Sequence, residues 1–247
     1  EPGTGKTQAA YFVAWHFGLD PAESVFKFVV RSTSEAQDLV YRFDDVAYFR
    51  DERGAAARRE HVKRGPLWRA YDHGATSVVL IDEIDKAPRD FPNDLLDVLD
   101  QHAFEVPEYA APGEDTYRVR KPADQPPPLV IITSNGERAL PGPFLRRCVF
   151  HHIQLTEDLL RKAVERHRAT DFPGLDDDAI EAGLAKVNEL RRRDDLNKKP
   201  STSEALRWLT VLDRRKVGAD RLDVAPGRLP MLGVLVKDPD DLDLLTG

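Results

Sequence analysis

The fold of this chain is decided by its first seven residues, Glu1-Pro2-Gly3-Thr4-Gly5-Lys6-Thr7. They fit the last seven positions of the pattern G-x-x-x-x-G-K-[ST], in which glycines let backbone N–H groups approach phosphate oxygens. In such a loop Lys6 reaches the β- and γ-phosphates, and the Thr7 hydroxyl binds Mg²⁺ at the start of a helix. A glycine-rich turn before an ordinary helix is the alternative that this stretch alone leaves open.

The given sequence starts inside this motif, at Glu1 rather than at a methionine. We therefore expect an N-terminal truncation, with the first glycine of the motif and the β-strand that leads into it preceding Glu1. Such a strand would lie in the middle of a mostly parallel sheet.

A second motif is the run Ser77-Val78-Val79-Leu80-Ile81-Asp82-Glu83. It predicts a buried strand that ends in two adjacent carboxylates, of which Asp82 would steady the Mg²⁺ shell and Glu83 would polarise an attacking water. Two solvated acids at the end of a strand are the alternative. The two motifs together predict a nucleotide-binding site with Thr7 and Asp82 as the metal ligands.

The composition is typical of a soluble globular protein of one large or two modest domains, with 247 residues, 41% hydrophobic and 32% charged. The net charge of −7 argues against a protein that coats nucleic acid. The longest aliphatic runs have four residues, far short of the roughly 20 that cross a bilayer. A single cysteine, Cys148, suits a reducing compartment, and we expect a cytoplasmic location.

The apolar pattern divides the chain into three segments. Residues 1–155 alternate β-branched runs with amphipathic stretches, which predicts an α/β domain with a doubly wound, mostly parallel sheet. Residues 156–217 show helical spacing only and predict a small helical lid, opened by Thr156 as a helix N-cap. Residues 218–247 form a tail rich in Pro and Asp, whose apolar run 229–236 either docks as a strand or packs without one.

Shorter signals predict individual elements of the first segment. We expect helices at 5–17, closed by Gly18, and at 65–73, opened by Gly65-Pro66. Strands are predicted at 25–30, 76–81 and 129–133, a surface helical insertion at 44–64, and a protruding hairpin with strands at 104–108 and 116–119.

These motifs together resemble the AAA+ ATPases, and more narrowly their MoxR-like branch. The resemblance covers residues 1–148 and is carried by EPGTGKT, Gly65-Pro66-Leu67, DEIDKAP at Asp82–Pro88, the paired segments FEVPE and TYRVR, and ITSNGERALPGPFLRRC at Ile132–Cys148. It implies the P-loop NTPase fold of that superfamily, with the nucleotide bound between the α/β domain and the lid.

The resemblance also assigns polar residues to three functional positions: sensor 1, the arginine finger and sensor 2. Asn135 matches the sensor-1 position, where an amide orients water; an Asn-Gly turn is the alternative. Arg147 matches the arginine finger that reaches the nucleotide of a neighbouring subunit, with Arg146 as its substitute and an exposed basic pair as the alternative. In the lid, Glu204 occupies the usual place of a sensor-2 arginine within the capping box Ser201–Glu204, and Arg207 is either its replacement or a solvated residue.

The function implied is ATP hydrolysis by a hexameric ring that remodels or matures a protein client, in company with a von Willebrand factor A domain protein. Two alternatives stay open. One is a scaffold that binds nucleotide with negligible turnover, which the altered sensor-2 position suggests. The other is a nucleic-acid motor or a restriction-type GTPase, because related AAA+ branches share these motifs.

Overall fold

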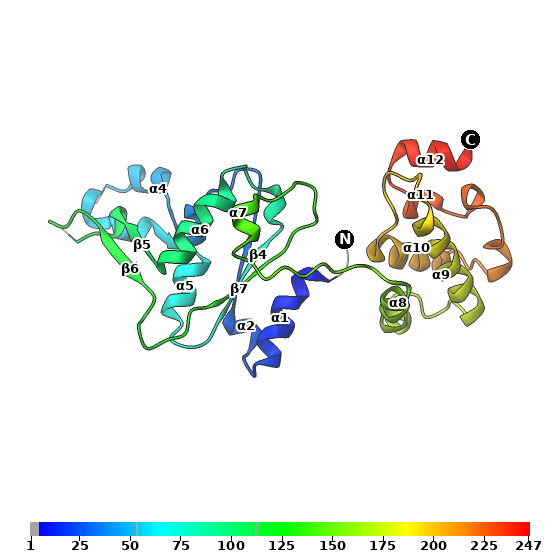
Figure 1. The fold of residues 1–247 in the computed structure, drawn as a ribbon, viewed down its shortest axis with the longest axis horizontal. Helices are drawn as coiled ribbons and strands as arrows, with labels where there is room; N and C mark the ends of the chain where they lie inside the picture. The colour runs from blue at the N-terminus through cyan, green and yellow to red at the C-terminus, as the bar shows by residue number, and fades with distance from the viewer. Residues whose placement is uncertain (1–4, 53, 112) are drawn as a thin grey trace. The chain divides into compact units, whose positions relative to one another are not determined.

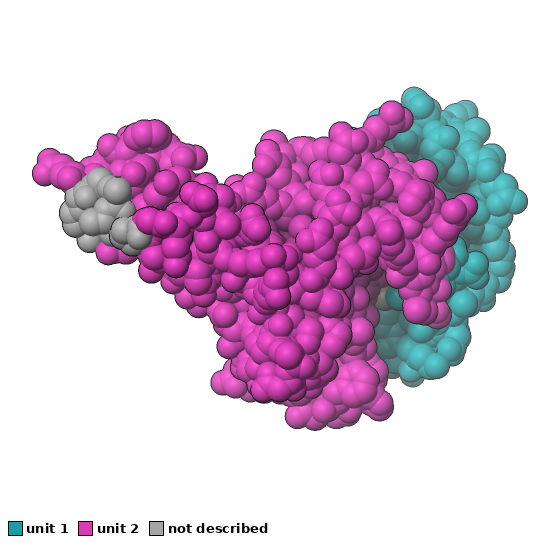
Figure 2. Space-filling model, turned by 60° about the vertical axis from the view of Figure 1, so that its left-hand side comes forward, with its two compact units in different colours: residues 1–4, 152–247 teal, residues 5–151 magenta. Residues whose placement is uncertain are grey.

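The computed structural model describes residues 5–52, 54–111 and 113–247, of which 54–56 are described for their backbone alone. The chain divides into two compact units, residues 5–151 and residues 152–247, which are coloured separately in Figure 2. The elements of the first unit are α1 (Lys6–His16), α2 (Pro21–Ser24), β1 (Val25–Val29), α3 (Gln37–Val40), β2 (Tyr41–Phe43), α4 (Asp45–Arg50), η1 (Gly54–His61), β3 (Val62–Arg64), α5 (Pro66–Asp72), β4 (Val78–Asp82), η2 (Ile84–Lys86), α6 (Phe91–Gln101), β5 (Ala103–Val106), η3 (Pro107–Tyr109), β6 (Tyr117–Arg120), β7 (Leu129–Ile132) and α7 (Gly142–Leu145).

The main sheet of this unit is parallel throughout, with the strand order β1-β4-β7. Two of its strands, β4 and β7, are labelled in Figure 1. Its central strand β4 is buried at every position, which explains why its sequence is continuously apolar rather than alternating. The strands predicted at 25–30, 76–81 and 129–133 are therefore confirmed to within two residues at each end.

Helices cover both faces of this sheet. Alternate residues of β4 point to opposite sides, so Val78 and Leu80 pack on Ala10 and Ala14 of α1. Val79 and Ile81 pack on the second face, against α5 and α6. The predicted α/β class with helices around a parallel sheet is confirmed, and each parallel strand ends at the same edge of the sheet.

The insertion predicted at 44–64 is helical only in part. It contains α4 and η1, but residues 62–64 form β3, which pairs antiparallel with β2. The prediction of a wholly helical insertion was wrong because such a short strand is defined by its partner rather than by its own residues. The hairpin predicted nearby is confirmed, with β5 and β6 antiparallel and Phe104 opposite Val119.

The second unit is a bundle of helices with strong N-caps. Thr156 caps α8, as predicted, and its hydroxyl accepts a hydrogen bond from the N–H of Leu159. Ser201 and Glu204 form the predicted capping box of α10. The helices of this unit are α8 (Glu157–Asp171), α9 (Asp177–Arg192), α10 (Thr202–Arg214), η4 (Ala219–Arg221), η5 (Pro226–Arg228), α11 (Leu232–Leu235) and α12 (Pro239–Thr246).

Residues 218–247 pack within this helical unit. The apolar run 229–236 contains α11 rather than a strand, and its leucines join the core around Trp208. The indole N–H of Trp208 donates to the carbonyl of Pro230 at 2.8 Å. Buried Asp241 of α12 accepts the N–H groups of Asn197 and Lys198 at 2.7 and 2.9 Å. Of the two alternatives left open for this run, packing without a strand is the one observed.

Two buried tyrosines of the first unit predict opposite effects of the same substitution. The Tyr71 hydroxyl is buried without a hydrogen-bond partner among the described residues, whereas burial and the neighbouring Glu108 carboxylate raise the pKa of Tyr41 to about 12. We expect Tyr71→Phe to raise the free energy of unfolding at pH 7 by about 1 kcal/mol, and Tyr41→Phe to lower it by about 1 kcal/mol. Urea denaturation of the two variants measures both signs.

Tyr71 also makes the free energy of unfolding depend on pH. Burial raises the pKa of Tyr71 to about 12, so an unfolded chain releases this proton near pH 10 while the folded chain still holds it. The contribution of this raised pKa to the free energy of unfolding is complete below pH ~10 and is lost as the pH rises towards 12. Wild-type protein should therefore lose more stability between pH 9.5 and 11.5 than Tyr71→Phe, and equal losses would contradict this account.

Candidate nucleotide site

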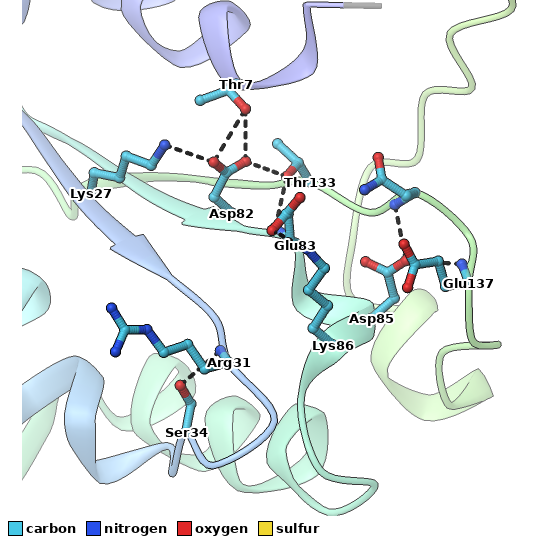
Figure 3. A network of polar contacts seen from close by, with 11 residues as sticks. Thr7, Lys27, Arg31, Ser34, Asp82, Glu83, Asp85, Lys86, Thr133 and Glu137 are labelled. Atoms are coloured by element: carbon cyan, nitrogen blue, oxygen red, sulfur yellow. Dashed lines mark hydrogen bonds and ion pairs between the residues drawn. The ribbon is translucent and has the colours of Figure 1, made fainter. Parts of the chain in front are cut away.

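The site begins where α1 meets the end of β4. The Thr7 hydroxyl, in the first turn of α1, donates to the carboxylate of Asp82, at 2.9 Å from Oδ1 and 3.2 Å from Oδ2 (Figure 3). Gly5, two residues before Thr7, adopts a left-handed φ of 79° that favours glycine. The two predicted metal ligands thus lie together, and a hydroxyl beside a carboxylate is a set of hard oxygen donors that fits Mg²⁺.

A second side chain, Lys27 of β1, also holds Asp82, with its Nζ 2.7 Å from Oδ2. Lys27 is paired in register with Leu80, so Asp82 is its diagonal neighbour on the same face of the sheet. Burial raises the pKa of the Asp82 carboxyl, but hydrogen bonds from Lys27, Thr133 and Thr7 outweigh this and leave the pKa below its ordinary value. The carboxylate is therefore charged at neutral pH.

Thr133, directly after β7, binds both acids at the end of β4. Its hydroxyl donates to Asp82 Oδ1 at 2.7 Å and accepts the backbone N–H of Glu83 at 2.9 Å. The Thr133 side chain is buried, so neither bond is shared with bulk water.

The Glu83 carboxylate meets Lys86, whose Nζ donates to Oε2 at 2.6 Å (Figure 3). This hydrogen bond raises the pKa of Lys86. Glu83 has a left-handed φ of 63°, which is uncommon for a residue with a side chain and turns the chain sharply out of β4. Its carboxylate is partly exposed, as a residue that acts on a water molecule must be.

Asp85 connects this turn to the loop after β7. Its Oδ2 accepts the backbone N–H groups of Asn135 and Glu137, at 3.1 and 2.9 Å, while its buried Oδ1 has no partner among the described residues. The side-chain amide of Asn135 makes no hydrogen bond to any described residue and is left for a ligand or a water. Asp85 thus fixes the backbone of the sensor-1 position without engaging the amide.

The remaining predicted residues lie outside this cluster or outside the described residues. Pro2, Gly3 and Thr4 fall in the part of the chain that the structure does not describe. Arg147 is exposed and its Nε lies 3.5 Å from Asp100 at the end of α6, so within one chain it does not join the Asp82 cluster.

Sequence reasoning missed four residues of the site. A lone lysine in the apolar run Val25–Val30 was a signal for Lys27, and a threonine at the end of a predicted strand was one for Thr133. Asp85 and Lys86 stood inside the quoted DEIDKAP segment without a role.

Comparison with protein families places this chain in a known class. The fold and the Thr7–Asp82–Glu83 geometry define a P-loop NTPase of α/β type. The family model described as AAA domain (Cdc48 subfamily) matches residues 2–139, more than half of the chain. The chain belongs to this AAA family, whose members bind nucleotide.

One solved structure supports the fold. NtrX from Brucella abortus, in complex with ADP, is similar with a TM-score of 0.51 and 17% identity, over 97% of this chain and 48% of NtrX. This chain therefore spans about half of that structure. A candidate ATPase from Cytophaga hutchinsonii matches with a TM-score of 0.37 and 15% identity, over 85% of this chain and 68% of its own. A comparison with curated proteins gave no match.

No helix among the described residues is both long and apolar enough to cross a membrane.

Proposed function

We propose that this chain binds ATP with Mg²⁺ at the Thr7–Asp82 cluster and hydrolyses it to ADP and phosphate. The observation that carries the proposal is the contact between the Thr7 hydroxyl and Asp82, with Glu83 on the adjacent residue. Phosphoryl transfer to water needs groups that hold the metal ion and a group that activates the water. The Thr7 hydroxyl and the charged Asp82 can supply the first, and the partly exposed Glu83 can supply the second.

Each residue then has one task. Lys6 and the N-terminus of α1 bind the phosphates, while Thr7 and Asp82 hold the metal ion. Bound Mg²⁺ would neutralise charge that develops on the phosphate oxygens. Glu83 accepts the proton of the attacking water through Oε1, since Oε2 is engaged by Lys86. The free amide of Asn135 orients that water.

The position of Arg147 favours an oligomeric protein. It is exposed and bound only loosely to Asp100, as a residue that acts on another subunit should be. We infer a homo-oligomeric ring, a hexamer by the MoxR-like resemblance, in which Arg147 completes the site of its neighbour. From the same resemblance we propose that the ring acts on a protein client. Its partner would be a von Willebrand factor A domain protein, and its location the cytoplasm.

One observation favours the scaffold as a second candidate. Glu204 is used in the capping box, and Arg207 is exposed on α10, so no described residue is committed to the sensor-2 role. A nucleic-acid motor has less support, because the basic run at 191–193 is engaged within its own unit. Arg191 donates to backbone carbonyls, Arg192 pairs with Glu157, and Arg193 pairs with Asp195.

The deciding experiment measures ATP turnover per subunit of the full-length protein as a function of its concentration, with Mg²⁺ and with Glu83→Gln as the blank. Turnover that rises cooperatively with concentration supports a site completed between subunits. ATP binding without turnover above the blank favours the scaffold. Preference for GTP, or stimulation by DNA at low salt, would favour the restriction-type or nucleic-acid alternatives.

Asp85 supplies a prediction for this reaction. Asp85→Ala removes the acceptor of two backbone N–H groups in the Asn135 loop, so the water-orienting amide loses its support. We expect kcat to fall roughly 10–100-fold, the size of effect that a misplacement of about 1 Å produces, with little change in KM for ATP. Asp97→Asn, on an exposed face of α6, is the control for loss of one negative charge. A KM that rises while kcat holds would contradict this role.

A further inference from the structure

We infer that Thr133 is a positioning residue that sets the catalytic orientation of Glu83, an inference that rests on the proposed function. The first step is the chemistry of a hydroxyl, which has one proton to donate and lone pairs to accept. The proton of Thr133 goes to Asp82 Oδ1, at 2.7 Å, so a lone pair is left to receive the N–H of Glu83, at 2.9 Å. One buried oxygen atom therefore holds both acids.

The second step concerns the backbone at the end of the sheet. The regular pairing of β4 with β7 ends at Ile81 and Ile132, and Thr133 then supplies the next three bonds. Its N–H donates to the Ile81 carbonyl, its carbonyl accepts the N–H of Ile84, and its side chain takes the N–H of Glu83. The hydroxyl thus replaces the ladder bond that is lost where Glu83 turns into the left-handed region.

The third step is what depends on this turn. A left-handed φ at a residue other than glycine persists only where the surrounding structure holds it. Here the turn sends the carboxylates of Asp82 and Glu83 in different directions, one to the Thr7 hydroxyl and the other to Lys86. Without the Thr133 hydroxyl, the N–H of Glu83 loses its acceptor and Glu83 can relax towards an extended conformation. Its carboxylate would then leave the position from which it reaches the water.

The test compares Thr133→Val, which keeps the shape and removes the hydroxyl, with Thr133→Ser, which keeps the hydroxyl. We expect kcat for ATP to fall about 10–100-fold in the valine variant while KM changes less than about 3-fold, and the serine variant to stay within about 3-fold of wild type. Thr202→Val is the matched control, because Thr202 is also buried and its hydroxyl has no partner among the described residues. Thermal unfolding of all variants shows whether each one is folded.

Three outcomes overturn the inference: turnover of Thr133→Val equal to wild type, an equal loss in Thr133→Ser, or a loss that appears in KM alone. If the valine variant does not fold, the serine variant still decides, because a loss in a folded Thr133→Ser contradicts a role of the hydroxyl. Failure of the proposed function is distinguishable from these results, since wild-type turnover would then not exceed that of Glu83→Gln.

Discussion

Glu83→Gln should lower ATP turnover by about 10²–10⁴-fold, the usual contribution of a general base, and leave nucleotide binding intact. Glutamine has nearly the same shape as glutamate, and the backbone N–H of residue 83 still donates to Thr133. The amide cannot accept the proton of the attacking water, so chemistry stops while the Thr7–Asp82 cluster is unchanged. Single-turnover hydrolysis and the equilibrium affinity for ATP measure the two halves of this prediction.

The exposed Glu165 of α8 provides a control for the loss of one carboxylate. Glu165→Gln removes the same charge in the other unit and should leave turnover unchanged. If Glu83→Gln retained more than about a tenth of wild-type turnover, another group would be the base, because a loss of less than about 10-fold is well below the usual contribution of a general base. If it lost ATP affinity instead, Glu83 would belong to the binding site rather than to the chemistry.

The central part of the fold could be predicted because its signals are local. β4 and β7 are continuous apolar runs, as strands buried on both faces must be, and α1 begins where the glycines of the phosphate loop end. The strand β3 could not be predicted in the same way, since its three residues carry no pattern and form a strand only against β2. For residues 218–247 the sequence left open whether the apolar run docks as a strand or packs without one, and its leucines pack around Trp208.

In the site, too, residues with a local sequence signal could be predicted and residues that depend on strand pairing could not. Thr7, Asp82 and Glu83 could be predicted because each belongs to a contiguous motif whose chemistry is known. Lys27 and Thr133 reach Asp82 from two other strands, so their roles depend on sheet register, which the sequence does not state. A rule follows for parallel sheets: polar residues at or near the ends of the strands beside a catalytic strand are candidates for the same site.

Asp82→Asn is expected to abolish the effect of Mg²⁺ on nucleotide affinity. Loss of even an outer-shell partner of a bound metal costs about 10–100-fold in metal affinity, so the loss of a direct ligand should cost at least as much. The substitution also leaves the positive charge of Lys27 without its carboxylate partner, and this charge would repel a nearby Mg²⁺ ion. Titration of ATP into the Glu83→Gln background, with Mg²⁺ and with EDTA, measures the effect without hydrolysis.

In the Glu83→Gln background, affinity should be clearly higher with Mg²⁺ than with EDTA, and the double variant with Asp82→Asn should give the same affinity in both. Asp97→Asn, which removes one exposed carboxylate from α6, should keep the full difference and so controls for net charge. Thr7→Val offers a second route to the same result, because it removes the other proposed ligand while leaving Asp82 charged. If Asp82→Asn kept the Mg²⁺ effect and Thr7→Val also did, the metal ion would be bound elsewhere, and the contact between these residues would be structural alone.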